Sequence, residues 1–463
     1  MKVFLPYIGK TTYLNGACSP NVDKPYLYLG FSEALAEENQ PYCSLAIFNS
    51  QLSIRSHIMK KYKLKNGIKL IYKFRTSDIT SFCIGFNAGA LEEIEKFNLG
   101  TAHALEHMVS KGTKKRSEKE INSLCDKIFG FENAMTNFPY VVYYGTSLSE
   151  DFEKGLELYS DIILNPIFPE EGFKEEMDII MEEFKEWSDD IYQYCEDSLL
   201  YNSFSGKRIK NLIIGRSDSI KAITLKDIKE FYERYYVPEN CVISVCSSLG
   251  FDEVLHIVKE YFQGWNKEFK GINQEVKEIN SPGIFTEKIS NIKGAKIQYL
   301  FNIDDLDEEE VKALTLFNAA FGEGTSGILY EEIRTKNGLA YDVGSFIKNE
   351  RGIKFFSINM GTSIESIEKA LTITNYKIEQ IKKSKGYFNE EKIRDLSKSI
   401  KLKRQLKLEK SIQLCKELTT YELMYGSAEK VYEEVENLEC INEKKILEVI
   451  NKVLKNPTIQ VLT

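Results

Sequence analysis

Two histidines and a glutamate form a compact motif with the composition of a metal site: His103, Glu106 and His107. Residues 98–109 contain no helix breaker after Gly100, so the segment predicts a helix. Residues four apart lie on the same face of a helix, so the two imidazoles can bind one metal ion. Glu106 lies on an adjoining edge of that face, where it can reach a water molecule on the ion. The spacing therefore predicts a zinc site with Glu106 as the general base.

The histidine content of the chain makes this motif specific. The chain has only 4 histidines in 463 residues, and two of them belong to the motif. The alternative is a pair of ordinary core histidines on a helix, which we consider the weaker hypothesis because the spacing is so particular. His57 and His256 are each isolated among polar neighbours, and we expect both to be ordinary surface or packing residues.

A zinc site needs a third protein ligand, and a predicted helix over residues 173–191 provides a candidate. Its apolar residues recur at helical spacing and form one stripe, which also contains Glu176 and Glu183. A carboxylate on a buried face is costly unless it is paired or binds a metal. We therefore expect Glu183 to be the third ligand and Glu176, two turns earlier, to orient a histidine. The alternative is an acidic, solvated helix, and Glu182 is the next candidate ligand.

These residues belong to the first of two similar halves of the chain. The tetrapeptides 145–148 and 361–364 each read Gly-Thr-Ser followed by an apolar residue, and each precedes a helical segment. Phe168 and Phe388 then open further long helices in the two halves. The period of roughly 215 to 220 residues is far longer than a solenoid repeat, so it indicates a duplicated domain. The order of elements predicts an α+β fold with two homologous domains, each a mainly antiparallel sheet covered by helices.

The expected organisation has four parts. They are an N-terminal extension over 1–60, a catalytic zinc-binding domain over 61–272, a linker over 273–283 and a metal-free homologous domain over 284–463. The extension contains four of the ten prolines together with aromatic runs, which predicts irregular, partly strand-forming structure. An Asn-Gly turn within residues 62–70 predicts the first two strands of the catalytic domain. The second half contains no histidine and has Lys401-Leu402-Lys403-Arg404 where the first has Glu183, so one half alone is expected to hold the metal.

The overall composition argues against several classes of protein. A net charge of -8 argues against nucleic acid as a partner, because phosphate binding needs a basic surface. No apolar run reaches the roughly 18 residues needed to cross a membrane. The first residues lack a secretory signal, and no arginine precedes Arg55, as a transit peptide would require, so we expect a cytoplasmic location. Nine cysteines without a C-x-x-C motif indicate reduced, mostly buried thiols.

Taken together, the motifs resemble the pitrilysin/insulinase family of inverted-motif zinc metallopeptidases, in particular the branch like mitochondrial processing peptidase. Residues 103–113 are similar to that branch's H-x-x-E-H-M-x-x-K-G-T signature, except that Ser110 stands where an apolar aromatic residue is usual. The substitution alters packing near the helix and is expected to touch no ligand. The step from His107 to Glu183 and the acid pair Glu176/Glu183 fit the family's distal ligand. The resemblance covers about residues 60 to 463, and the extension has no counterpart.

The same resemblance implies substrate-contacting residues in both halves. Asn133 and Ala134 are similar to an edge-strand segment that pairs with the substrate backbone. The glycine cluster over residues 322–327, with Arg334 and Tyr341, resembles the family's glycine-rich loop and its Arg/Tyr pair near the scissile bond. Taken alone, Arg334 and Tyr341 would more often be surface or packing residues.

The resemblance implies a zinc-dependent endopeptidase or oligopeptidase that hydrolyses unfolded peptides inside an enclosed chamber. His103, His107 and Glu183 would bind Zn²⁺, while Tyr341 and Arg334 would donate hydrogen bonds to the peptide carbonyl. Two domains form half of such a chamber, so a homodimer is expected, or a heterodimer with a related subunit. Turnover of short peptides and maturation of a precursor both fit. The alternatives are a non-catalytic structural or partner subunit of the same fold and a zinc-dependent peptide-binding module.

Overall fold

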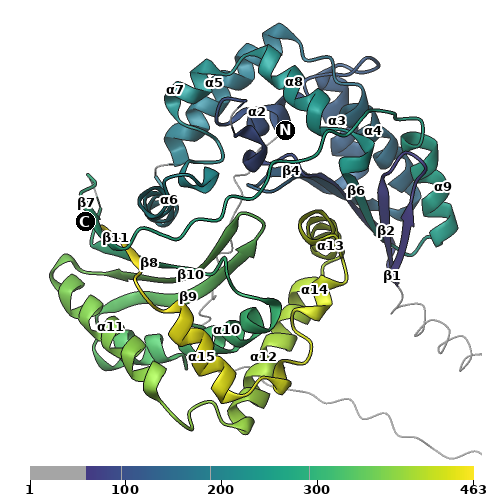
Figure 1. Ribbon diagram of the computed structural model, residues 1–463. Coiled ribbons are helices and arrows are strands. Elements are labelled where there is room, and N and C mark those ends of the chain that lie inside the picture. The colour runs from purple at the N-terminus through teal and green to yellow at the C-terminus, as the bar shows by residue number, and fades with distance from the viewer. Residues whose placement is uncertain (1–58, 95, 188, 291) are drawn as a thin grey trace, which may run out of the picture. The chain divides into compact units, whose positions relative to one another are not determined.

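Two β-sheets, one in each half of the sequence, organise the protein (Figure 1). The computed structural model describes residues 59–94, 96–187, 189–290 and 292–463. The expectations for the N-terminal extension therefore lie outside the described residues, apart from the two residues at its end that open the first strand. Residues 59–463 form one compact unit.

The first sheet has six strands in the order β1-β2-β6-β3-β5-β4. Their bounds are β1 Met59–Lys63, β2 Lys69–Phe74, β3 Ile79–Phe86, β4 Phe129–Thr136, β5 Val141–Leu148 and β6 Cys241–Ser247. All neighbouring pairs are antiparallel except β2 with β6. The predicted Asn-Gly turn joins β1 to β2, and Gly67 has the positive φ of 103° that this turn requires. Strand β4 lies at the edge of the sheet.

The second sheet has five strands in the order β7-β11-β8-β10-β9. Their bounds are β7 Gly283–Glu287, β8 Ala295–Asn302, β9 Ala340–Glu350, β10 Ile353–Thr362 and β11 Thr458–Leu462. Only β7 and β11 are parallel. Both sheets are thus mainly antiparallel, as predicted.

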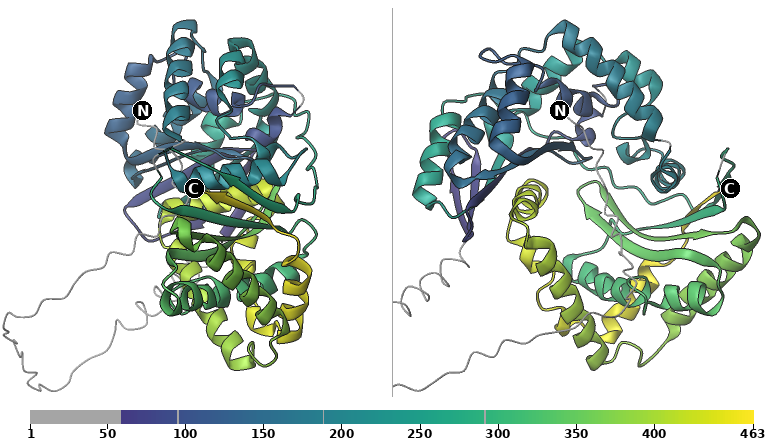
Figure 2. Two further views of the ribbon diagram at one scale, coloured as in Figure 1. Left: turned by 90° about the vertical axis from the view of Figure 1, so that its left-hand side faces the viewer. Right: turned by 180° about the vertical axis from the view of Figure 1, so that it is seen from behind.

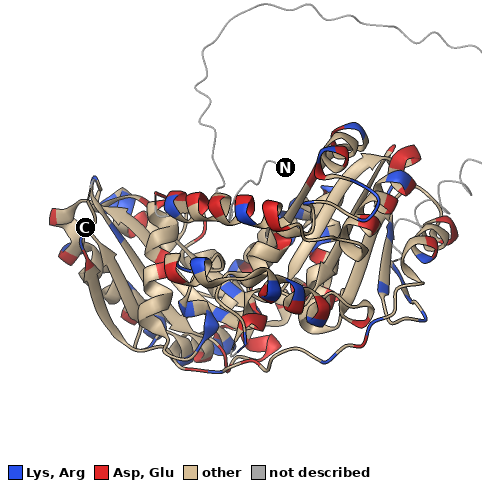
Figure 3. Cartoon of the chain, turned by 90° about the horizontal axis from the view of Figure 1, so that it is seen from above, with Lys and Arg blue, Asp and Glu red and all other residues tan. Residues whose placement is uncertain are grey.

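Helices cover the sheets and account for most of the remaining chain. Those of the first half are α2 Thr101–Met108, α3 Glu118–Ile128, α4 Phe152–Leu164, α5 Glu170–Trp187, α6 Ile191–Ser203, α7 Ser217–Ala222, α8 Leu225–Tyr235 and α9 Phe251–Phe262. Those of the second half are α10 Glu308–Phe321, α11 Ile367–Lys383, α12 Glu390–Leu408, α13 Ser411–Tyr425, α14 Lys430–Glu433 and α15 Glu443–Val453. Within the described part of the chain, no helix has the length and apolar character needed to cross a membrane. Acidic and basic residues are intermixed along the helices (Figure 3).

The two halves repeat one order of elements, which confirms the predicted fold of two homologous α+β domains. In the first half, β5 leads through the 3₁₀ turn η2 (Ser149–Asp151) to α4, α5 and α6. In the second, β10 leads through η6 (Ile364–Ser366) to α11, α12 and α13. Each half has its own large apolar cluster, and in the first half α2, α4, α8 and α9 pack on one face of the sheet (Figure 2).

The halves exchange their equivalent third helices, which the sequence pattern did not reveal. Helix α6 of the first half packs on β8 and β11 of the second sheet, and α13 of the second half packs on β3, β5 and β6 of the first (Figure 1). Across the second contact, Leu414 and Leu418 join an apolar cluster with Val242, and Thr419 Oγ1 lies 2.9 Å from Ser244 Oγ. In sequence, the segment 273–283 separates the strands of the first sheet from those of the second. Helices α6 and α13 do not respect this division, because each packs on the sheet of the other half. The domain boundaries therefore stay a prediction.

Candidate metal centre

A buried carboxylate fixes the start of α2. Glu93, in the 3₁₀ turn η1 (Ala90–Glu93), accepts hydrogen bonds through Oε1 from the backbone N–H groups of Gly100 at 3.1 Å and Ala102 at 2.9 Å. The first N–H groups of a helix have no partner within the helix, and the helix dipole favours a negative charge there. The guanidinium of Arg208 donates to the other oxygen of Glu93, with Nη2 at 2.6 Å. The direction in which α2 leaves Gly100 is thus set by a buried ion pair.

Helices α2 and α5 bring the three predicted ligands together. His103, His107 and Glu183 each offer one ligand atom within 4.8 Å of the others. Oε2 of Glu183 lies 3.9 Å from Nε2 of His103 and 3.7 Å from Nε2 of His107. The alternative ligand, Glu182, is exposed and pairs with Lys185 at 2.6 Å.

Unpaired buried atoms show that this arrangement fits a metal ion. Among the described residues, Nε2 of His107 and Oε2 of Glu183, which lie 3.7 Å apart, are both buried without a hydrogen-bond partner. Each such atom costs about 1–3 kcal/mol when it stays unpaired. Two imidazole nitrogens and one carboxylate oxygen are a donor set of catalytic zinc sites, which keep a fourth position open. The residues therefore fit Zn²⁺.

Glu176 lies behind the ligands and orients His107. Its Oε2 lies 2.7 Å from Nδ1 of His107, and its Oε1 lies 3.1 Å from Nζ of Lys111. Burial alone would raise the pKa of Glu176, but the hydrogen bonds and charges of His107 and Lys111 bring it below its ordinary value. For His103, burial and the neighbouring His107 lower the pKa well below its ordinary value, so the ring is neutral, the form that binds a metal.

Glu106 is buried beside the ligands, with an exposure of 5 %. Thr136, at the end of β4, donates a hydrogen bond from Oγ1 to Oε2 of Glu106 at 2.5 Å. Burial raises the pKa of Glu106 above its ordinary value, against the opposing effects of His107 and Thr136. A carboxyl group whose pKa is raised is better matched to taking up and returning a proton near neutral pH.

The strand that carries Asn133 and Ala134 runs past Glu106 as an edge strand. Strand β4 pairs with β5 on one side, where Asn133 lies opposite Tyr144, and forms the edge of its sheet on the other. An exposed edge of this kind can add an extended peptide by main-chain hydrogen bonds. Because Thr136 is bonded to Glu106, a peptide on this edge would pass the metal centre.

The structure places Arg334 and Tyr341 together but at a distance from the metal centre of the same chain. Arg334 lies in the π-helix η5 (Tyr330–Lys336), with its guanidinium carbon 5.1 Å from the ring centroid of Tyr341, which is 83 % exposed. Tyr341 is near the start of β9, whose 11 residues extend over roughly 33 Å. Arg351, just beyond the far end of β9, donates to Glu92 at 2.8 Å, beside the Glu93 that anchors α2. Tyr341 therefore lies at the end of β9 remote from α2.

The glycine cluster over residues 322–327 connects α10 to η5. A Cβ atom on Gly322 would lie 1.9 Å from Oγ of Ser345 in β9, so only glycine allows this close approach. The cluster thus holds η5 and β9 together.

Ser110 departs from the sequence expectation that it contacts no ligand. Its hydroxyl donates to the carbonyl of His107 at 3.0 Å, which ties it to the backbone of a ligand residue. His256, by contrast, is exposed on α9, with Glu260 3.8 Å away.

Sequence reasoning missed two residues that act at the site, Glu93 and Thr136. Glu93 lies in an irregular acidic stretch without helical periodicity, and Thr136 is one of many strand threonines. Only the burial of Glu93 and the contact of Thr136 with Glu106 reveal their roles.

Comparison with known proteins places this geometry in a family. Residues 71–217 match the family model described as insulinase, peptidase family M16, and residues 222–398 match the model described as peptidase M16 inactive domain. The chain belongs to the insulinase family of peptidases, M16. This confirms the family that its motifs resemble, and the metal centre lies within the segment that matches the insulinase model.

Relatives and solved structures agree with this assignment. An uncharacterized zinc protease of Bacillus subtilis, YmxG, is 24% identical over 394 residues, which are 84% of this chain and 94% of the relative. Mitochondrial-processing peptidase subunit beta of Bos taurus is 30% identical over 201 residues, 43% of this chain and 40% of that protein. A protease from Helicobacter pylori has the same fold, with a TM-score of 0.79 at 20% identity over 88% of this chain and 99% of that chain.

Proposed function

We propose that this M16 protein is an active zinc-dependent peptidase that hydrolyses extended, unfolded peptides. The observation that carries the proposal is the convergence of one donor atom each from His103, His107 and Glu183, within 4.8 Å of one another, beside the buried Glu106. The edge strand β4 supports it, because it gives a peptide a way to bind past these residues.

Each step of the reaction has a residue suited to it. Zinc, when bound, supplies Lewis acidity that polarises the peptide carbonyl and lowers the pKa of water. Glu106 takes the proton of the attacking water and passes it to the leaving amine, while Thr136 holds its carboxylate in place. The free edge of β4, around Asn133 and Ala134, binds the peptide in extended form. Glu176 keeps His107 in one orientation throughout.

The donors to the peptide carbonyl come from a second chain in this proposal. Tyr341 and Arg334 lie at the end of β9 remote from α2, and the Tyr341 side chain is 83 % exposed. They are thus free to face the metal centre of another subunit and stabilise the charge on the carbonyl oxygen. Because this chain carries both sets of residues, the first choice is a homodimer that encloses the peptide. A heterodimer with a related subunit is the alternative.

Glu106→Gln separates the peptidase from the two other candidate functions, a non-catalytic subunit and a zinc-dependent peptide-binding module. The glutamine can still accept from Thr136, so the variant should fold, bind zinc and bind peptide. Without a general base, cleavage of a peptide library, followed by mass spectrometry, should fall by about 10²–10⁴-fold. If wild type and variant both bind zinc and peptide and neither cuts, the protein is a binding module and the peptidase proposal is wrong.

The ligand assignment has its own matched pair of variants. Glu183→Ala should weaken zinc binding about 10-fold or more, measured by competition with a chromophoric chelator. Glu182→Ala removes a neighbouring but exposed carboxylate and should leave zinc affinity unchanged. The reverse outcome would move the third ligand to Glu182.

A further inference from the structure

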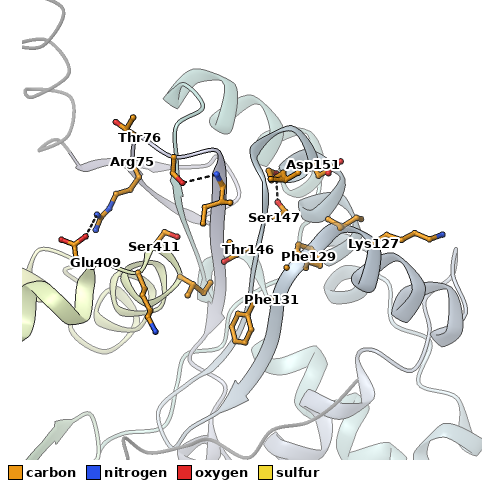
Figure 4. A pocket seen from close by; sticks show the side chains of 17 residues that line it. Arg75, Thr76, Lys127, Phe129, Phe131, Thr146, Ser147, Asp151, Glu409 and Ser411 are labelled. Carbon is orange, nitrogen blue, oxygen red and sulfur yellow. Dashed lines mark hydrogen bonds and ion pairs between the residues drawn. The ribbon is translucent and has the colours of Figure 1, made fainter. Parts of the chain in front are cut away.

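A pocket of about 920 Å³ lies at the end of β4 that is remote from Glu106, and it is here named the distal pocket. Its walls come from four places: the start of β4, the end of β5, the turn between β2 and β3, and the junction of α12 and α13. Figure 4 shows Arg75 and Glu409 on one side of the pocket and Phe129 and Phe131 on the other. Arg75 ties the turn between β2 and β3 to the end of α12, since its Nη2 donates to the carbonyl of Leu408 at 2.7 Å.

The lining of the distal pocket combines polar and charged residues with a group of large apolar side chains. Three large apolar side chains of the first sheet are half exposed here: Phe131 and Leu148 at 50% each and Ile79 at 40%. Ile412 of α13 lines the same space. Single exposed apolar residues are ordinary, but several gathered in one hollow are typical of a binding site.

The start of β4 also leaves room for another chain to approach. Its register with β5 shifts between Phe129 and Phe131, so Gly130 is a bulge residue without a partner in β5. A Cβ atom on Gly130 would meet only the carbonyl oxygen of Thr146, at 4.0 Å, among the described atoms. A glycine in a strand with open space beside it is typical of a place where a ligand or another backbone comes close.

The distal pocket and the metal centre share one strand. Thr136, which contacts Glu106, and Phe131, which lines the pocket, are separated by about 17 Å along β4 at roughly 3.3 Å per residue. A peptide added to the free edge of β4 with its reactive bond beside Glu106 therefore brings a residue about five or six positions away to the pocket.

We propose that the distal pocket binds a large apolar side chain of the peptide substrate, five or six residues from the cleaved bond. The inference rests on the proposed peptidase function. From its N-terminal to its C-terminal end, strand β4 runs from the pocket towards Glu106. A peptide that pairs antiparallel with β4, as β5 does on the other side, therefore runs from Glu106 towards the pocket. The selected residue is therefore on the C-terminal side of the cleaved bond. Peptides too short to reach the pocket lose this contact.

Gly130→Leu tests the pocket by filling it, because the new side chain enters space that is open beside the strand. Phe131→Ala tests the pocket by the opposite change, because it removes a large apolar side chain from the lining. The control is Gly250→Leu at the start of α9, where a Cβ atom also meets no atom within 4 Å among the described residues. Cleavage is compared between a short peptide and two long peptides that carry leucine or serine at the selected position.

We expect the ratio of kcat/KM for the long leucine peptide to that for the short peptide to fall about 10-fold in both pocket variants. The ratio should be unchanged in Gly250→Leu, and the long serine peptide should resemble the short one in the wild type. An unchanged ratio in both pocket variants would overturn the proposal. Selection of an apolar residue on the N-terminal side instead would overturn the antiparallel direction.

Binding separates a failure of this inference from a failure of the peptidase function. The long leucine peptide, labelled with a fluorophore, is titrated into zinc-loaded Glu106→Gln protein with and without Gly130→Leu. Weaker binding in the double variant supports the pocket even if the wild type cuts nothing, which would refute only the peptidase proposal. Equal binding, or a change of oligomeric state in sedimentation with no effect on the peptide, would show that the pocket is not a substrate site.

Discussion

Replacing Glu93 by glutamine tests whether a buried ion pair holds helix α2, which carries the candidate ligands His103 and His107. Glu93 is 1% exposed, and Arg208 donates to its Oε2 from Nε at 3.0 Å and from Nη2 at 2.6 Å. Its Oε1 accepts the N–H groups of Gly100 and Ala102 at the start of α2. Glutamine has nearly the same shape and retains one acceptor oxygen. The change therefore removes the charge and leaves the guanidinium of Arg208, whose side chain is 2% exposed, without a counter-charge.

The expected cost follows from that burial. Removing one partner of a buried ion pair destabilises a protein by about 3–5 kcal/mol, because the other charge stays buried and uncompensated. Losing the negative charge at the start of α2 adds up to about 1 kcal/mol. Burial raises the pKa of Glu93 despite the opposing effect of Arg208, which is consistent with a carboxylate that depends on its partner. We expect a loss of about 4 kcal/mol in the free energy of unfolding.

Urea unfolding of the metal-free protein measures this loss without any contribution from bound zinc. Glu230→Gln is the control, since Glu230 pairs with Lys96 and Lys226 at the surface, and such pairs contribute about 0–1 kcal/mol. The double variant Glu93→Gln/Arg208→Met removes both charges and should recover about 2 kcal/mol or more of the loss. A loss in Glu93→Gln no larger than in Glu230→Gln, or a double variant less stable than the single one, would refute the reasoning.

Three further predictions follow from other contacts. Glu176→Gln should weaken zinc binding about 10–100-fold in a chelator competition, because His107 loses its carboxylate partner, and unchanged affinity would remove Glu176 from the site. Burial raises the pKa of Asp197 to about 7, against the hydrogen bonds it accepts from Trp187 and Gln193. An acid whose pKa is raised by folding favours the folded state at low pH, so wild type should lose up to about 4 kcal/mol of stability between pH 4 and pH 7. Asp197→Asn should lack that loss in urea unfolding at each pH, and parallel curves for the two proteins would contradict the assignment. If the site is shared between subunits, mixing inactive Glu106→Gln chains with inactive Tyr341→Phe chains should restore about one quarter of wild-type activity, since half of the dimers are mixed and each has one intact site. No recovery after subunit exchange would contradict a site in trans.

The local part of the metal centre was readable from the sequence because helices impose a period. The four-residue step from His103 to His107 determines that both rings lie on one face of α2. The same period separates the buried Glu176 on α5 from its exposed neighbour Glu175, and Glu183 from Glu182. These side chains were predictable one by one, because each depends only on neighbours within two turns.

Contacts between distant segments were not readable in this way. Nothing in the local pattern around Glu93 indicates that its charge meets Arg208, because the pair is 115 residues apart in sequence. The exchange of α6 and α13 between the sheets is similar, since both helices are only weakly amphipathic and packing alone decides which sheet they cover. Amphipathicity shows that a face will be buried and does not name the surface that buries it.

By itself, the sequence predicted the donor set of the candidate site and determined the family and the duplicated α+β fold, because residue type, helical period and repeated segments are local properties. Only the tertiary structure decided that donor atoms of His103, His107 and Glu183 lie within 4.8 Å of one another, since that depends on how α5 packs against α2. It also decided that Tyr341 lies at the end of β9 remote from α2, because a strand of 11 residues is stiff and extended. The candidate ligands were therefore predictable from residue types, while the position of Tyr341 and the distal pocket on β4 depend on where the folded strands end.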